Sequence, residues 1–167
     1  MVILKEKGGE RTLPIIMSMQ RSVMVLMRVK MDIPLSIPLT LPDLNYRMMQ
    51  RFGIKLASVE ITELKEGTFF CRIIGEREGE RQTLNMCMAT DGIVMAVIAH
   101  CPIMIEEELL QAQYLHKMGE NSFAMNINLL SRSMLEDALK HAVENEHYEA
   151  ASHLRDELMK RPPMQES

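Results

Sequence analysis

The sequence contains no tryptophan, four phenylalanines, three tyrosines and three cysteines in 167 residues. Cys71, Cys87 and Cys101 are odd in number and show no Cys-x-x-Cys spacing, which argues against a zinc or redox motif and against a disulfide-rich secreted fold. We expect reduced, buried thiols. No apolar run reaches the roughly 20 residues that span a bilayer, and "MVILKEKGGE" is too short in apolar length for a signal peptide. These absences predict a cytoplasmic protein without a membrane segment.

What is present is the composition of an ordinary globular protein, with 47% apolar and 25% charged residues. The length suits one sizeable core and a small appendage. The net charge of −4 is shared unevenly: residues 1–60 hold nine Lys/Arg against five Asp/Glu, and the remainder holds ten against eighteen. A surface of mixed charge explains this more simply than a basic groove for nucleic acid, although such a groove is the alternative.

Strand signals dominate the first two thirds of the chain. Two β-prone segments flank Gly8-Gly9, which indicates a hairpin with a tight turn. Three further runs, at 54–64, 68–77 and 80–88, are separated by short polar turns and predict an antiparallel meander. "PIMI", residues 102–105, predicts one more short strand.

Helix signals alternate with these strands. Apolar residues at Val23, Leu26 and Met27 predict one face of a helix that ends before the proline-rich segment 32–42. Thr40 is the predicted cap of a second helix that ends near Gly53, and Thr90 the predicted cap of a third that ends before residue 102. The sequence therefore predicts an α+β fold, a mixed or antiparallel sheet packed with two or three helices, plus a C-terminal α-helical hairpin.

The C-terminal segment has the strongest local pattern in the chain. Apolar residues recur at helical spacing in two short stretches on either side of Asn145-Glu146; they are Leu135, Ala138, Leu139 and Ala142, then Tyr148, Ala151, Leu154 and Leu158. Two short helices bury too little apolar area to be very stable alone. We expect this pair to dock against its own domain, a copy of itself or another protein.

The residues of this segment closely resemble the UVR motif of the UvrB and UvrC repair proteins. The similarity rests on the run from Glu146 to Asp156, preceded by Leu135, Leu139 and Ala142, with His147 where an acid is usual. The resemblance implies a protein partner, contacted by Tyr148, Glu149, Leu154 and Arg155. We expect a domain at 1–117, a linker at 118–130 and the hairpin at 131–163. We also expect the protein to form a homo-oligomer.

The first domain resembles the bifunctional nuclease family. The similarity is carried by "LKEKGGERTLPI", "PLT" with the following "DL", "FGIKLASVEITELKEGTFFCRI" and "TDGIVMAVIAHCPIMIEEELL". The resemblance implies an enzyme that cuts DNA and RNA. Several of the family's polar residues are absent: its Arg-Pro-Leu-Thr-His-Asp-Leu is "IPLTLPDL" here, and of its Asp-x-Arg-Pro-Ser-Asp-Ala only Asp91 keeps its charge. These losses predict weakened or absent activity.

Asp91 and Asp43 are the candidate catalytic residues that remain, and Asp91 is the candidate metal ligand. Phosphodiester hydrolysis generally needs a cation held by carboxylate oxygens, so we expect Mg²⁺ or Mn²⁺ and no organic cofactor. Both aspartates follow a predicted helix start, where a first-turn acid stabilises its helix by about 0.3–1 kcal/mol without any ligand. A purely structural role is therefore the alternative for each residue.

Two functions follow from these patterns. One is a metal-assisted nuclease acting on DNA or RNA, and the other is a non-catalytic adaptor that recruits a protein partner through the hairpin. The 17 methionines bear on the choice. Methionine most often fills gaps in a core, but an exposed methionine patch would suit adaptable binding.

Overall fold

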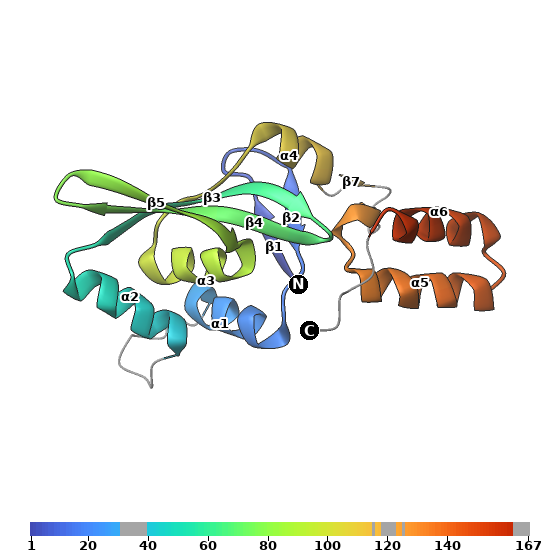
Figure 1. Cartoon of the computed structure of the whole chain (residues 1–167), viewed down its shortest axis with the longest axis horizontal. Coiled ribbons are helices and arrows are strands. Elements are labelled where there is room, and N and C mark those ends of the chain that lie inside the picture. The colour runs from blue at the N-terminus through green and yellow to red at the C-terminus, as the bar shows by residue number, and fades with distance from the viewer. Residues whose placement is uncertain (31–39, 115, 118–122, 125, 162–167) are drawn as a thin grey trace.

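The computed structural model describes residues 1–30, 40–114, 116–117, 123–124 and 126–161. These residues form an α+β fold, which confirms the predicted class (Figure 1). A four-stranded sheet lies over a layer of helices, and a helical pair projects from one end. None of the described helices is long and apolar enough to cross a membrane.

The central sheet contains the predicted meander. Its strand order is β5-β4-β3-β6, with β3 (Lys55–Lys65), β4 (Thr68–Arg77) and β5 (Glu80–Met88) antiparallel and β6 (Ile103–Ile105) parallel to β3. Gly67 and Gly79 occupy the two turns at φ 76° and 85°, values that glycine reaches without steric cost. Val59 and Ile61 alternate along β3 and are fully buried, as the pattern predicts.

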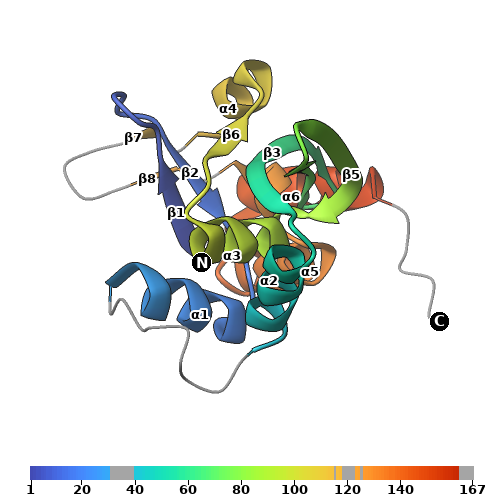
Figure 2. The same ribbon diagram turned by 90° about the vertical axis from the view of Figure 1, so that its left-hand side faces the viewer.

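Helix α3 (Ala89–Ala99) forms the centre of the molecule. It packs against β3 and β4 on one side and against α1 (Met19–Lys30) and α2 (Leu41–Arg51) on the other, so it lies between the sheet and these two helices (Figure 2). Ile93, Val94 and Ala96 are at most 2% exposed. Gly92 permits this close approach, because a Cβ there would lie 2.7 Å from Cys71 Sγ.

The start of α3 differs from the prediction. Its N-cap is Met88, the last residue of β5, and Thr90 lies inside the first turn. Thr90 is 8% exposed, and its hydroxyl has no hydrogen-bond partner among the described residues. The predicted cap at Thr90 is therefore wrong, because β5 runs directly into the helix and the extended backbone of Met88 already serves as the cap.

The N-terminal hairpin of β1 (Val2–Lys5) and β2 (Thr12–Ile15) is a separate two-stranded sheet. The hairpin is confirmed, but its connection is longer than a tight turn and Gly8 has a positive φ of 81°. Arg11 closes the loop by bonding Glu6 at 2.6 Å, and it also bonds Glu107 of α4 (Glu107–Gln113) at 2.5 Å. This triad attaches the hairpin to the helix beside the sheet edge.

The C-terminal part begins with β7 (His116–Lys117), β8 (Phe123–Ala124) and the 3₁₀ turn η1 (Ile127–Leu129). Residues 118–122 and 125 of the predicted linker lie outside the described residues. Helices α5 (Arg132–Glu144) and α6 (Tyr148–Met159) then form the predicted hairpin-like pair. Figure 1 shows its turn pointing away from the sheet.

Arg161 and Gly67 join the helical pair to the domain. The Arg161 side chain, 6% exposed, donates to the backbone carbonyls of Asn128 and Leu130 and pairs with Glu157 at 2.9 Å. Gly67, in the turn between β3 and β4, packs so closely on Leu130 that a Cβ would lie 2.4 Å from its carbonyl oxygen. The base of the pair is therefore fixed to one end of the sheet.

Candidate functional site

Asp91 lies in the first turn of α3 and its side chain is 51% exposed. Both of its carboxylate oxygens are bonded by Arg21 of α1, with Nε–Oδ1 at 2.6 Å and Nη2–Oδ2 at 3.1 Å. Two parallel bonds of this kind are the strongest arrangement for a guanidinium and a carboxylate. Asp91 is therefore accessible to solvent, but its negative charge is already balanced by Arg21.

Asp43 is 1% exposed in the first turn of α2. Its Oδ2 accepts bonds from the Thr40 amide at 3.0 Å and the Thr40 hydroxyl at 2.6 Å, while Arg28 of α1 donates to Oδ1. Burial raises the pKa of Asp43, but the bonds from Thr40 and the Arg28 ion pair outweigh it and leave the pKa below its ordinary value. Thr40 is the N-cap of α2, as predicted, and Asp43 completes the capping box from the first turn of the helix.

Helix α1 supplies both arginines, and sequence reasoning missed them. Arg21 and Arg28 are seven residues apart, two helical turns, so they lie on one face together with the buried Val25. The predicted apolar stripe lies on the other side: Leu26 is 49% and Met27 is 42% exposed. The helix itself is confirmed, but the face that it turns toward the domain is the one that carries the two ion pairs.

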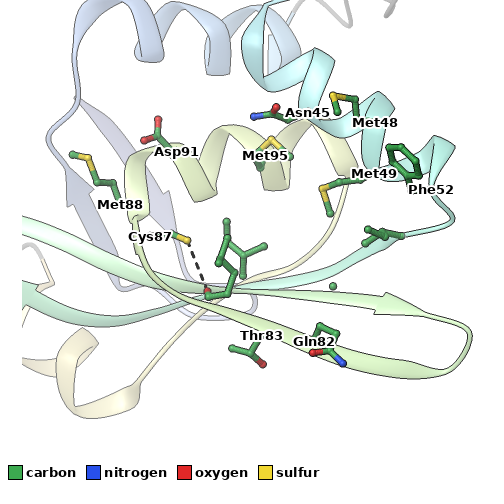
Figure 3. Close-up of a pocket in the computed structure, with 14 residues that line it drawn as sticks. Asn45, Met48, Met49, Phe52, Gln82, Thr83, Cys87, Met88, Asp91 and Met95 are labelled. Carbon is green, nitrogen blue, oxygen red and sulfur yellow. Dashed lines mark hydrogen bonds between the residues drawn. The ribbon is translucent and has the colours of Figure 1, made fainter.

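A groove of about 810 Å³ opens between α2, α3 and the β4–β5 hairpin (Figure 3). Apolar side chains make up most of its described lining: Met48, Met49, Phe52, Ile54, Ile73, Leu84, Met88 and Met95. Asp91 is the only charged residue among the described lining residues, and Asp43 is not among them. The groove thus combines a methionine-rich wall with one acid, Asp91, that is paired with Arg21.

The described methionines lie at the edge of the core or at the surface. None of those described is fully buried. Four pack against the edge of the core, namely Met17, Met24, Met49 and Met95, and the other described methionines are exposed. Filling of the core accounts for these four at most, and the exposed methionines fit the alternative of an accessible methionine surface.

Two cysteines lie beside the groove. Cys87 lines it, and Cys71 is fully buried on the neighbouring strand. Burial raises the pKa of Cys71 to about 12, with smaller contributions from the nearby Cys87 and Asp91. Burial also raises the pKa of Cys87, again with a contribution from Asp91. Neither thiol is activated for nucleophilic chemistry at neutral pH.

Among the described residues, the two candidate acids do not fit a resident divalent cation. Within the described part of the chain no group of three or more His, Cys, Asp or Glu side chains could hold a metal ion. Both oxygens of Asp91 are bonded by Arg21, and Asp43 is buried in the first turn of α2. Carboxylate oxygens that are free to face the ion are what Mg²⁺ requires.

The four predicted partner-binding residues lie on α6. Tyr148 is 67% exposed, Glu149 is exposed, and the Arg155 side chain is 63% exposed and 3.6 Å from Asp156. Leu154 is only partly exposed. Three of the four side chains therefore project into solvent.

Two comparisons with known proteins bear on identity. The sequence model of the bifunctional nuclease domain matches residues 2–118, which include the sheet, helices α1 to α4 and the groove. A search of curated proteins finds no match. The helical pair lies outside the matched residues, so its likeness to the UVR motif stays a prediction. The match covers well over half of the 167 residues, and the chain belongs to the bifunctional nuclease domain family.

Proposed function

We propose that this chain uses the nuclease scaffold for binding and recruits a protein partner through the α5–α6 pair, without metal-dependent hydrolysis. The observation that carries the proposal is that each candidate acid is already paired and that, among the described residues, no group of three or more His, Cys, Asp or Glu side chains could hold a metal ion. Arg21 occupies both oxygens of Asp91, and Arg28 and Thr40 occupy those of Asp43. A carboxylate in such a pair is poorly placed to take a proton from water, and a cation at Asp91 would need further ligands that the described lining of the groove does not supply.

The turn of the helical pair is the part best placed to meet a partner. Val143 and Tyr148 flank it and are 51% and 67% exposed. Glu146 and Glu149 are exposed beside them, whereas Glu144 forms an ion pair with Lys140 at 4.0 Å. This arrangement favours a partner segment that presents an apolar side chain between basic residues.

A second candidate function is nucleic-acid cleavage, which family membership favours. Asp91 is half exposed at the edge of the groove, and a phosphate group could compete for Arg21, because guanidinium binds phosphate as well as carboxylate. Released in this way, Asp91 would be the only acid among the lining residues that the structure describes. The second candidate therefore needs a further ligand from the substrate itself.

One assay distinguishes the two functions. Purified full-length protein is incubated with plasmid DNA and with RNA in Mg²⁺ or Mn²⁺, then in EDTA, beside Asp91→Ala. We expect no metal-dependent cleavage by either protein. Cleavage that requires metal and disappears in Asp91→Ala would establish the nuclease and overturn the first proposal.

The binding function needs its own measurement. Full-length protein serves as bait, and any partner recovered is then purified and titrated by calorimetry. Truncating a central aromatic contact typically weakens binding by 2 kcal/mol or more, about 30-fold, so Tyr148→Ala should weaken it by that factor. Met134→Ala, an exposed apolar change near the base of the pair, is the control. Equal affinity for all three proteins would exclude the turn as the contact.

A further inference from the structure

We propose that Cys71 and Cys87 form a reversible disulfide across β4 and β5, made by exchange with a low-molecular-weight disulfide such as oxidised glutathione. The two residues are direct partners in the antiparallel register of these strands. Directly opposed residues have Cα atoms about 4.5–5.5 Å apart and point to the same face of a sheet. A disulfide spans Cα distances of about 4.4–6.8 Å, so the pair can join without a large backbone shift.

Both side chains face the helical layer. A Cβ at Gly92 of α3 would lie 2.7 Å from Cys71 Sγ, which places this sulfur on the α3 side of the sheet. Cys87 lines the groove together with Asp91 and Met95 of the same helix. The dashed line in Figure 3 joins Cys87 Sγ to the carbonyl of Leu84 in the same strand, at 3.8 Å. The pair is thus a facing dithiol, with one thiol at the surface and one below it.

Cys101 is not part of this pair. It follows the C-terminal end of α3, whereas Cys87 immediately precedes the N-terminal end. The 11 residues of the helix lie between them, a length of roughly 16 Å at 1.5 Å per residue. Cys101 lines a different cavity, with Arg28 and His100. It therefore serves as an internal control.

Exposure sets the order of the two steps. The thiolate of Cys87, which the groove makes accessible, attacks one sulfur of oxidised glutathione, forms a mixed disulfide and releases one glutathione thiolate. The thiolate of Cys71 then attacks Cys87 Sγ and releases the second glutathione. Two protein thiols each lose a proton and together give up two electrons, and one glutathione disulfide is reduced to two thiols.

The surrounding burial makes this exchange slow at neutral pH. The pKa of each thiol is raised by burial, so only a small fraction is thiolate at pH 7. The rate should rise about tenfold per pH unit while pH stays below the pKa of Cys87, because the thiolate is the attacking species.

The bond would fix a point where the sheet is irregular. The register of β4 and β5 shifts between Cys71 and Ile73, and Met86 has a positive φ of 58° there. Cys87 is one residue before the cap of α3 and four residues before Asp91. Oxidation would link the junction between β5 and α3 covalently to β4. It would also move Cys87 Sγ away from the groove. The inference is independent of the proposed function.

The test uses full-length protein equilibrated in glutathione buffers from fully reduced to fully oxidised at pH 8.5, then alkylated and measured by mass spectrometry. Cys101→Ser leaves only the proposed pair, and Cys87→Ser removes it. We expect wild type and Cys101→Ser each to lose two hydrogens without added glutathione mass, and Cys87→Ser to form no internal disulfide.

Three results would overturn the proposal: a stable glutathione adduct on Cys87, pairing through Cys101, or thiols that stay reduced in the most oxidising buffer. A second measurement covers variants that fold poorly. Wild type oxidised in guanidinium should give a mixture of pairings, whereas the folded protein should give only Cys71–Cys87. The same mixture from the folded protein would show that the register does not select the pair.

Discussion

Replacement of Arg28 by alanine tests whether α1 is held in place by its ion pairs. Breaking a buried ion pair by removing one partner costs about 3–5 kcal/mol, and breaking an exposed pair costs about 0–1 kcal/mol. Asp43 is buried and the Arg28 side chain is 19% exposed, but Thr40 continues to bond Oδ2. We therefore expect Arg28→Ala to lower the free energy of unfolding by about 2 kcal/mol, between these limits.

Arg21→Ala is the matched control, because it removes the same side chain from the same helix face. Its partner Asp91 is 51% exposed, so the loss should stay below about 1 kcal/mol. For a chain of this length, a loss of 2 kcal/mol corresponds to a fall in melting temperature of about 4–8 °C. Calorimetry and urea unfolding at pH 7 measure both variants. Equal losses would refute the argument that burial decides the cost.

The pH dependence of Arg28→Ala gives a second check. The pKa of Asp43 is lowered on folding from an ordinary value of 3.8. A lowered pKa stabilises the fold fully above that ordinary value, and the contribution disappears as pH falls through the folded-state pKa. The stability difference between wild type and Arg28→Ala should therefore be constant from pH 7 to about 5 and shrink below about pH 4. A difference that stays constant in acid would exclude the carboxylate of Asp43 as its source.

Three other changes test packing. Gly92→Ala places a Cβ 2.7 Å from Cys71 Sγ and should destabilise the fold by about 1–3 kcal/mol through overpacking, as measured by thermal unfolding. Gly67→Ala places a Cβ 2.4 Å from the Leu130 carbonyl oxygen and should speed amide exchange in η1 and α5 more than in α3. Arg161→Ala removes the donors to Asn128 and Leu130 and should speed exchange at the C-terminal end of α6; unchanged exchange would show that the hydrophobic contacts alone hold the pair.

The sequence predicted the elements that depend on local pattern. The meander follows from alternation and from glycine at the turns, and Thr40 with Asp43 marks the start of α2. The inner face of α1 could not be read in the same way. Its partners are 15 and 70 residues away along the chain, at Asp43 and Asp91. A local apolar stripe carries no information about such long-range pairs.

The methionines show the same limit. Their composition suggests core filling, yet burial depends on which helix faces the sheet and which strand forms its edge. β5 is an edge strand whose residues are almost all exposed, so Met86 and Met88 remain accessible. The groove follows from this edge and from the position of α2, neither of which a single sequence specifies.

Ligand number, and not the strength of the Arg21 pair, limits metal binding at Asp91. A half-exposed ion pair contributes about 0–1 kcal/mol, which a divalent cation could overcome. Mg²⁺, however, is held by one or two carboxylates together with substrate phosphates, and Asp91 is the only acid among the described residues that line the groove. Arg21→Ala should therefore show no saturable Mg²⁺ binding by calorimetry in the absence of nucleic acid, where no substrate phosphate completes the ligand set. Saturable binding by Arg21→Ala that disappears when Asp91→Ala is added would show that Arg21 alone keeps a metal from this site.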